Sequence, residues 1–402
     1  MKIDTLKNLA NFIGSGCTPS RKNISYWNSA DVLWLKTEQL GEYKITSTAE
    51  HISHKAVIEC NLRIYPKNTI SVAMYGEGKT RGNVSLLGAP MTTNQACCNI
   101  EIDDAKIDYR YVYYYLKGQY ENLRQLSAGV RKNLNADDIK NFMIRYPEDK
   151  VTQKKITAVL GALDNKIALN KKINATLETM AKTLYDYWFV QFDFPDENGK
   201  PYKTSGGKMI YSSELGRDIP VGWEVKTLGD LLTENTTLFN QQTIEPTIDL
   251  SVMPSSSIAL DELSSSEMFS TNLFKMKEGD ILFGSIRPYL KKAGIAPCNG
   301  VVVGTVHSYQ AKKEFDYTFA LFTVCRDKFF DYAVKVSTGT RMPIIKSENL
   351  LSYKIAYSEN VVRLFDMPNL KRIICKNLQE NRRLAELRDW LLPMLMNGQI
   401  KF

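Results

Sequence analysis

The sequence is poor in the residues that build metal and disulfide sites. It has only three histidines, His51, His54 and His307, and its seven cysteines are scattered and never spaced C-x-x-C. A zinc site needs three or four converging ligands, and a disulfide framework needs paired cysteines in an oxidising compartment. We therefore expect reduced thiols, no metal site and a cytoplasmic protein.

Long hydrophobic runs are also missing. No stretch approaches the roughly 18 consecutive apolar residues of a membrane span, and the first residues do not form a charged-then-apolar leader. We therefore expect no membrane contact. The 402 residues, 44% of them hydrophobic, favour two or three globular domains. A net charge of +8 is compatible with an anionic partner such as nucleic acid but does not identify one.

Motifs for catalysis are incomplete. Residues 73–80, AMYGEGKT, fit the phosphate-loop pattern, but turn and strand residues follow where a helix should begin, so a hairpin tip is predicted. Asp196, Glu224 and Lys226 loosely fit a magnesium nuclease pattern, yet they flank a linker instead of sharing a sheet. Neither G-x-S-x-G nor an Asn/Asp-Pro-Pro-aromatic adenine-methylation motif occurs. We expect no methyltransferase, ATPase or nuclease activity from this chain alone.

The two halves of the chain repeat each other. SAGVR at 127–131 returns as STGTR at 337–341, and the dipeptide Asp-Tyr at 108–109 returns at 316–317. TLKNL at 5–9 resembles TLGDL at 227–231, and NKKI at 170–173 resembles NRRL at 381–384. Matches in the same order at nearly one offset indicate an internal duplication.

Each half combines a mixed α/β part with a helical part. Residues 1–148 and 223–360 contain short β-type runs, Gly and Pro turns and one helix each, near 108–124 and 316–333. Residues 149–192 and 361–402 are helical, and 193–222 are polar and turn-rich, which predicts a linker. The fold class is α+β, with two similar domains and two long helices.

The two helical segments carry coiled-coil seams. Their apolar residues alternate at spacings of four and three, and an asparagine stands at the same repeat position in both seams. We expect the helices to pair, with these asparagines fixing the register. Exposed asparagines on purely local seams are the alternative. The residues expected to pair are Ile156, Leu160, Leu163, Ile167, Asn170, Leu177, Leu184, Leu370, Ile374, Asn381, Leu384 and Leu391.

Basic residues gather with amide and aromatic residues on predicted loops. Lys and Arg neutralise phosphates, and Arg and Asn can pair with base edges. A solvated loop surface is the alternative, but two similar domains could touch a polymer at two places. The candidate DNA-binding residues are Lys79, Arg81, Asn83, Arg131, Lys132, Arg287, Tyr289, Lys291, Lys292, Arg341 and Lys346. Gly129 and Gly339 predict a backbone turn beside Arg131 and Arg341.

Several short motifs together resemble a known family. They are GCTPS at 16–20, NQA at 94–96, LDNKIALN at 163–170, IPVGWEV at 219–225 and NRRLAELRD at 381–389. With these motifs the chain resembles the specificity subunit of a type I restriction-modification system. The second half has no close match to GCTPS.

The resemblance implies two target-recognition domains separated by two antiparallel helices. Each domain would read half of a split DNA target, and helix length would set the unread spacer. The helices would dock two modification subunits, which use S-adenosylmethionine to methylate adenine, and restriction subunits would add ATP- and magnesium-dependent functions. The chain itself would bind no cofactor and be non-catalytic. The alternatives are an adenine methyltransferase with a fused recognition domain and a coiled-coil adaptor that binds only proteins.

Overall fold

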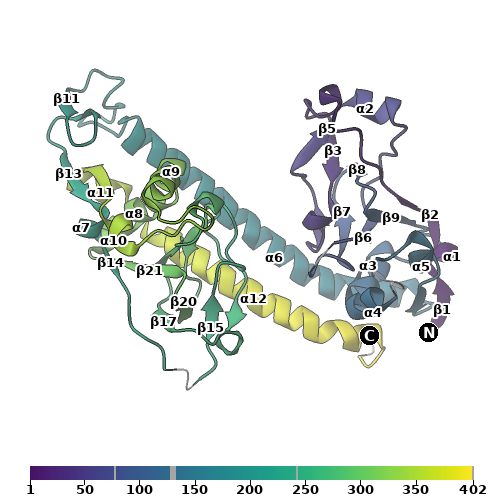
Figure 1. Ribbon diagram of the computed structural model, residues 1–402. Coiled ribbons are helices and arrows are strands. Elements are labelled where there is room, and N and C mark those ends of the chain that lie inside the picture. The colour runs from purple at the N-terminus through teal and green to yellow at the C-terminus, as the bar shows by residue number, and fades with distance from the viewer. Residues whose placement is uncertain (77, 127–132, 241–242, 401–402) are drawn as a thin grey trace. The chain divides into compact units, whose positions relative to one another are not determined.

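A computed structural model describes residues 1–76, 78–126, 133–240 and 243–400 (Figure 1). The chain divides into two compact units. The first contains Met1–Lys166 and Leu384–Phe402, and the second contains Ile167–Arg383. Two long helices, α6 (Lys150–Tyr185) and α12 (Pro368–Met396), each contribute residues to both units. Within the described residues, no helix is both long and apolar enough to cross a membrane.

The first unit is built on a five-stranded sheet of order β2-β9-β6-β7-β4. Its central strands β6 and β7 are short apolar runs buried along their whole length, and helix α3 adds Tyr111, Tyr113 and Tyr114 to the same core. A three-stranded sheet, β5-β3-β8, and the pair β1-β10 complete it. The strands are β1 (Lys2–Thr5), β2 (Ala10–Ser15), β3 (Val32–Leu35), β4 (Lys44–Ile45), β5 (Glu50–Ile52), β6 (Ile70–Ala73), β7 (Val84–Leu87), β8 (Thr92–Thr93), β9 (Cys97–Ile102) and β10 (Met143–Tyr146). The short helices are α1 (Leu6–Leu9), α2 (His54–Glu59), α3 (Tyr109–Gly118), α4 (Tyr120–Gln125) and α5 (Ala136–Lys140).

The second unit holds two four-stranded sheets, β14-β21-β18-β19 and β16-β15-β20-β17, and two further strand pairs, β13-β22 and β11-β12. Helix α8 is buried at every position and fills the core between sheet and long helices. The strands are β11 (Met209–Ser212), β12 (Arg217–Pro220), β13 (Glu224–Thr227), β14 (Leu232–Glu234), β15 (Pro246–Ile248), β16 (Ser264–Ser265), β17 (Leu273–Met276), β18 (Ile281–Gly284), β19 (Ala293–Ile295), β20 (Gly300–Val303), β21 (Val306–Ala311) and β22 (Lys354–Tyr357). The helices are α7 (Leu228–Leu231), α8 (Tyr317–Val324), α9 (Asp327–Val336), α10 (Ser347–Leu351) and α11 (Glu359–Phe365).

The predicted duplication is confirmed in the strand registers. In the first unit Thr5 lies opposite Met143, and in the second unit Thr227 lies opposite Lys354. Strand β6 pairs with β9 as β18 pairs with β21, with their residues at nearly the same repeat offset. The α+β class therefore holds for both halves. In each domain the first strand pairs with the last, β1 with β10 and β13 with β22.

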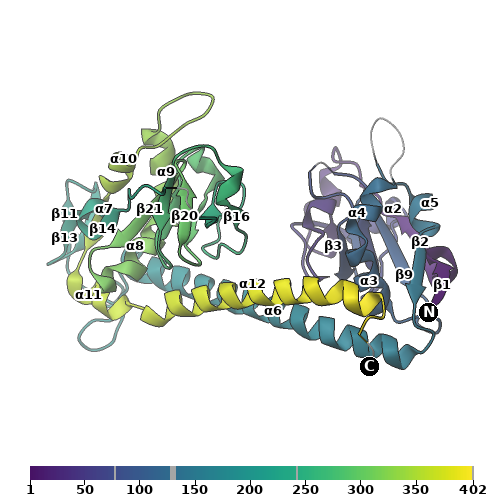
Figure 2. The same ribbon diagram turned by 90° about the horizontal axis from the view of Figure 1, so that it is seen from below.

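The long helices pair in antiparallel fashion, side by side in both views (Figures 1 and 2). In the second unit the Asn170 amide donates to Asn381 at 2.9 Å, and the Asn377 amide donates to Asn174 at 2.8 Å. Both pairs are buried, so the asparagines are not exposed residues on separate seams. Because the amides bond only in this alignment, they fix the register of the two helices.

The apolar seam residues divide between the two cores. Ile156 and Leu160 are buried in the core of the first unit, and Leu370 and Ile374 are buried in the core of the second. Leu177 and Leu184 pack at the edge of the second core, and Leu391 at the edge of the first. Leu163, Ile167 and Leu384 are half-buried. The helices are therefore held by the domains as well as by each other.

Two expectations about local structure were wrong. Residues 193–222 are not an open linker: they contain the hairpin β11-β12, and Phe194 and Ile219 are buried in the second core. The single helix expected in each domain is two helices, α3 and α4 or α8 and α9, because the chain turns at Gln119 and Arg326. Helix α6 ends in one π-helical turn, Asp186–Val190.

Candidate DNA interface

In the first unit, the connection between β6 and β7 carries Lys79 and Arg81. The strands are antiparallel and no helix follows Lys79, so the predicted hairpin is confirmed and the phosphate-loop pattern is accidental. Side chains of helix α4 bind the backbone of this connection. The Tyr120 hydroxyl donates to the Lys79 carbonyl at 2.8 Å, and Arg124 Nη1 donates to the Gly78 carbonyl at 2.8 Å. The Lys79 side chain is exposed and Arg81 is half-buried.

Asn83 stabilises the scaffold of this connection. Its Nδ2 donates to the Leu40 carbonyl at 3.1 Å, and Leu40 precedes Gly41, whose φ of +125° favours glycine. The amide therefore bonds a neighbouring turn within the protein. Of the first-unit candidates, Lys79 is the described side chain most exposed to solvent.

In the second unit, the connection between β18 and β19 occupies the equivalent place. Arg287 and Lys291 have φ values of +52° and +53°, so this tight turn holds two non-glycine residues in the left-handed region. The Lys291 ammonium pairs with Asp327 at 2.7 Å, and the Lys292 ammonium donates to the Leu250 carbonyl. These two lysines are engaged by the protein, whereas Arg287 and Tyr289 face solvent.

A second loop, residues 337–346, lies against that turn. The Arg287 amide donates to the Pro343 carbonyl at 2.8 Å, and the Ile345 amide donates to the Ser285 carbonyl at 3.0 Å. The structure therefore brings the candidate set around Arg287 together with Arg341 and Lys346, both of which are exposed. Within the described part of the chain, no ion pair joins Arg341 to Glu348.

Gly339 has the predicted turn conformation. Its φ is +96°, and a Cβ at this position would meet the Met342 carbonyl oxygen at 3.0 Å. Two hydrogen bonds between Thr338 and Ile344, each 2.9 Å, close the loop that presents Arg341. Its counterparts Gly129, Arg131 and Lys132 lie outside the described residues.

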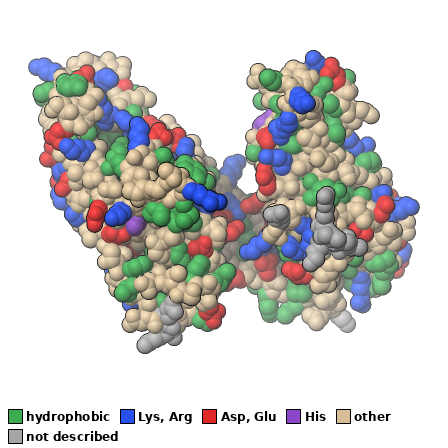
Figure 3. All heavy atoms as spheres, in the orientation of Figure 1, with side chains coloured by type: hydrophobic (Ala, Val, Ile, Leu, Met, Phe, Trp, Pro, Cys, Tyr) green, Lys and Arg blue, Asp and Glu red, His purple; other side chains and the backbone are tan. Residues whose placement is uncertain are grey.

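The first unit has the same loop junction. The Leu134 amide donates to the Met74 carbonyl at 3.1 Å, and both residues precede Ile345 and Ser285 by 211 positions. One backbone scaffold thus presents different side chains in the two domains. Figure 3 shows that Lys and Arg are interspersed with Asp and Glu on the face it displays, so the basic groups are local clusters.

Residues from the rejected motifs have ordinary structural roles. Asp196 accepts hydrogen bonds from the amides of Asn198 and Lys200, each 2.8 Å, and Lys226 pairs with Glu224 at 2.9 Å. His307 Nδ1 lies 2.8 Å from the Glu234 carboxylate. Among the described residues, no three His, Cys, Asp or Glu side chains are grouped to hold a metal ion.

A buried charge network in the first unit was missed from the sequence. The Asp164 carboxylate accepts from Arg388 Nη1 and from the Tyr114 hydroxyl, both at 2.7 Å. Burial lowers the pKa of Arg388, but Asp164 outweighs this and raises it above its ordinary value. Burial, and then Asp164, raise the pKa of Tyr114, which stays a neutral donor. Asp164 and Arg388 both lie in the family-like motifs at 163–170 and 381–389, which was the available signal.

Comparison with known proteins gives a consistent result. The family described as "Type I restriction modification DNA specificity domain" matches residues 1–179. The type I restriction enzyme MjaIX specificity subunit of Methanocaldococcus jannaschii is 30% identical over 97% of this chain and 91% of its own length. The HindI specificity subunit of Haemophilus influenzae is 24% identical over 70% of this chain and 74% of its own. A crystal structure of the S subunit from M. genitalium has the same fold, with a TM-score of 0.51 at 17% identity over 98% of this chain and 95% of that one.

Proposed function

Because the chain belongs to the family of type I restriction-modification DNA specificity subunits, we propose that its two α+β domains each read one half of a split DNA target. The observation that carries this proposal is the repeated loop junction, Met74 with Leu134 and Ser285 with Ile345. A common backbone scaffold with different exposed side chains suits two domains that read different base sequences. Arg287, Tyr289, Arg341 and Lys346 would face DNA in the second domain.

The engaged lysines would contribute less. Lys291 and Lys292 are already bonded to Asp327 and to the Leu250 carbonyl, so a phosphate would have to compete with these partners. Lys79 and Arg81 would serve the first domain, together with Arg131 and Lys132. The two domains carry an arginine at the same repeat position, Arg131 and Arg341, although they should read different bases. This favours a phosphate contact that positions the loop.

The long helices would dock two modification subunits. Leu169, Ile173 and Met180 are exposed on α6 at 52%, 37% and 64%, and Leu387 and Trp390 are exposed on α12 at 42% and 58%. Large apolar side chains on an exposed helix face favour a protein partner. In this arrangement S-adenosylmethionine would sit on the modification subunits, and ATP and magnesium on the restriction subunits, in the cytoplasm. The chain itself would select the target without carrying out chemistry.

A domain exchange tests the proposal. Residues 1–148 would be replaced by the matching domain of a relative with a different target, and methylated adenines would be mapped with the modification subunit present. We expect one half-site to change and the other to stay. The reciprocal exchange of 223–360 is the matched control. Unchanged methylation in both chimaeras, in complexes that still assemble, would contradict the proposal. Methylation by the chain alone would support the fused methyltransferase, and no DNA shift with its partner would support the adaptor.

A further inference from the structure

A basic cavity lies in the second unit, beside the hairpin β11-β12. Its volume is about 370 Å³, which falls in the range of small-molecule sites. Its walls include the rings of Tyr185, Phe189 and Tyr353, and Arg217, Arg326 and Lys328 line it as well. We call it the arginine cavity. None of these residues belongs to the candidate DNA loops.

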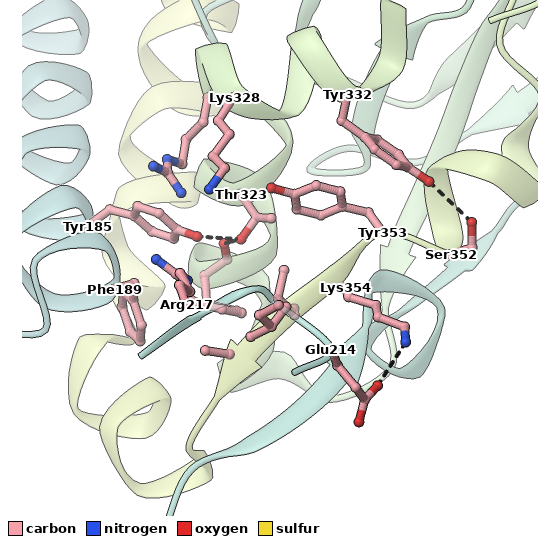
Figure 4. A pocket seen from close by; sticks show the side chains of 15 residues that line it. Tyr185, Phe189, Glu214, Arg217, Thr323, Lys328, Tyr332, Ser352, Tyr353 and Lys354 are labelled. Atoms are coloured by element: carbon pink, nitrogen blue, oxygen red, sulfur yellow. Dashed lines mark hydrogen bonds and ion pairs between the residues drawn. The ribbon is translucent and has the colours of Figure 1, made fainter. Parts of the chain in front are cut away.

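The cations of the arginine cavity outnumber its carboxylates. Glu214 lines the cavity but pairs with Lys354 at 2.8 Å, and Arg326 reaches the exposed Asp186 at 3.5 Å. Among the described residues, no carboxylate forms an ion pair with Arg217 or Lys328. In Figure 4 the polar ends of Lys328 and Tyr353 turn toward each other, and Arg217 lies on the other side of the Tyr185 side chain in this view.

Like charges oppose one another in this space. Burial lowers the pKa of Arg217; Tyr185 partly offsets this shift, and the neighbouring Arg326 lowers the pKa further. Partial burial, and then the two arginines, likewise lower the pKa of Lys328, although its side chain still reaches solvent. A bound anion would relieve this repulsion and accept charge-assisted hydrogen bonds from the guanidinium groups.

We propose that the arginine cavity binds the phosphate of a nucleotide, with the base against the half-buried Tyr353 ring. Guanidinium and ammonium groups are the ordinary partners of phosphate, and aromatic rings stack on any base. The Arg217 guanidinium is held in place because it stacks over the Phe192 ring at 4.8 Å. The proposal does not depend on DNA recognition by the loops, since its residues and its readout are separate.

Calorimetric titration of the full chain tests the site, with AMP, adenosine, inorganic phosphate and a 5′-phosphorylated single-stranded oligonucleotide as probes. We expect AMP to bind, inorganic phosphate to compete more weakly, and adenosine not to bind. Lys328→Gln should weaken AMP binding about tenfold, as loss of one charged contact does. Lys335→Gln, an exposed lysine on the same helix, should change nothing. Lys328 is exposed, so its variant should fold even if Arg217→Gln does not.

Each outcome decides the proposal. Binding of the oligonucleotide alone, with the same dependence on Lys328, supports the site and makes a strand end the source of the phosphate. Inorganic phosphate that competes as well as AMP overturns the role of the Tyr353 ring. The site is overturned if neither AMP nor the oligonucleotide binds. It is also overturned if Lys328→Gln and Lys335→Gln weaken AMP binding equally. Neither result bears on which half-sites the domains read.

Discussion

Asn170 donates a hydrogen bond to Asn381 at 2.9 Å, and the two residues occupy the same position of the sequence repeat, 211 residues apart. Equivalent residues of two antiparallel helices can meet only at the local twofold axis of the pair. The second bond, from Asn377 to Asn174, follows one turn along. Duplication of one helix therefore supplied both halves of this polar contact.

Replacing Asn170 alone should destabilise the helix pair. Asn170→Leu leaves the buried Asn381 without its donor, which costs about 1–3 kcal/mol of unfolding free energy. The double variant with Asn381→Leu should recover part of this loss, because the buried Asn381 amide is gone, although Glu380 still loses its hydrogen bond from Asn170. Urea unfolding measures the difference. Leu169→Ala, at an exposed neighbour, is the control. A double variant no more stable than the single one would count against this account.

Loss of the Arg388 charge should be more costly. Arg388→Met leaves the Asp164 carboxylate buried without its cation, an arrangement that costs about 3–5 kcal/mol. Adding Asp164→Asn should restore part of the stability. The exposed Arg383→Met, on the same helix, should stay within about 0.5 kcal/mol of wild type. Equal effects of the two arginine variants in thermal or urea unfolding would refute a structural role for the pair.

Asp108 and Asp316 share a repeat position but should respond oppositely to pH. Burial raises the pKa of Asp108, but Arg110, 2.8 Å away, outweighs this and leaves the pKa below its ordinary value. Its charge thus stabilises the fold above the unfolded-state pKa, and this contribution is lost as pH falls through the folded-state pKa. Asp108→Asn should cost about 1–3 kcal/mol at pH 7 and little in acid.

Asp316 is the matched comparison. Burial raises its pKa, although a bond from the Tyr357 hydroxyl at 2.7 Å lowers it. A raised carboxyl pKa means that ionisation opposes folding as pH increases. Asp316→Asn should therefore gain stability relative to wild type between acid and neutral pH. Unfolding curves at several pH values check both signs, and the same trend in both variants would contradict the assignment.

Arg341→Ala should weaken DNA binding without changing the methylated sequence. If the guanidinium contacts a phosphate, affinity should fall for all sequences and the salt slope should decrease by about one. Arg131→Ala should act likewise in the first domain. Arg363→Ala removes a charge that is paired with Glu359 on α11 and is the control. Relaxation at one base position would instead indicate a base contact, worth about 1–3 kcal/mol. Unchanged affinity would exclude this loop from the interface.

Lengthening both helices should change the spacer of the DNA target. Seven residues would be added between Asn170 and Asn174 and seven between Asn377 and Asn381, so that both amide pairs keep their partners. At 1.5 Å per residue this adds about 10.5 Å, or about three base-pair steps. The half-site sequences should not change when methylated adenines are mapped. An assembled variant that still methylates sites with the original spacing would refute the expectation that helix length sets the spacer.

The sequence determined the local and repeating features of this protein. Helix periodicity, turn residues and the repeated order of short motifs depend on neighbours along the chain. They therefore predicted both long helices, the α+β class and the asparagines at one repeat position. The turn at Gly339 and the β6-β7 hairpin were also predicted from the sequence. Backbone conformation at a tight turn depends on a few adjacent residues.

Only the tertiary structure decided which distant groups meet. Asp164 and Arg388 are 224 positions apart, and nothing local marks one as the partner of the other. Residues 193–222 look like a linker because they are polar, yet burial of Phe194 against a core from other segments holds their hairpin in place. Packing between segments likewise creates the ion pair of Lys291 with Asp327, the hydrogen bond from Ile345 to Ser285 and the arginine cavity. Side-chain availability depends on these long-range contacts, and a pattern along one chain does not specify them.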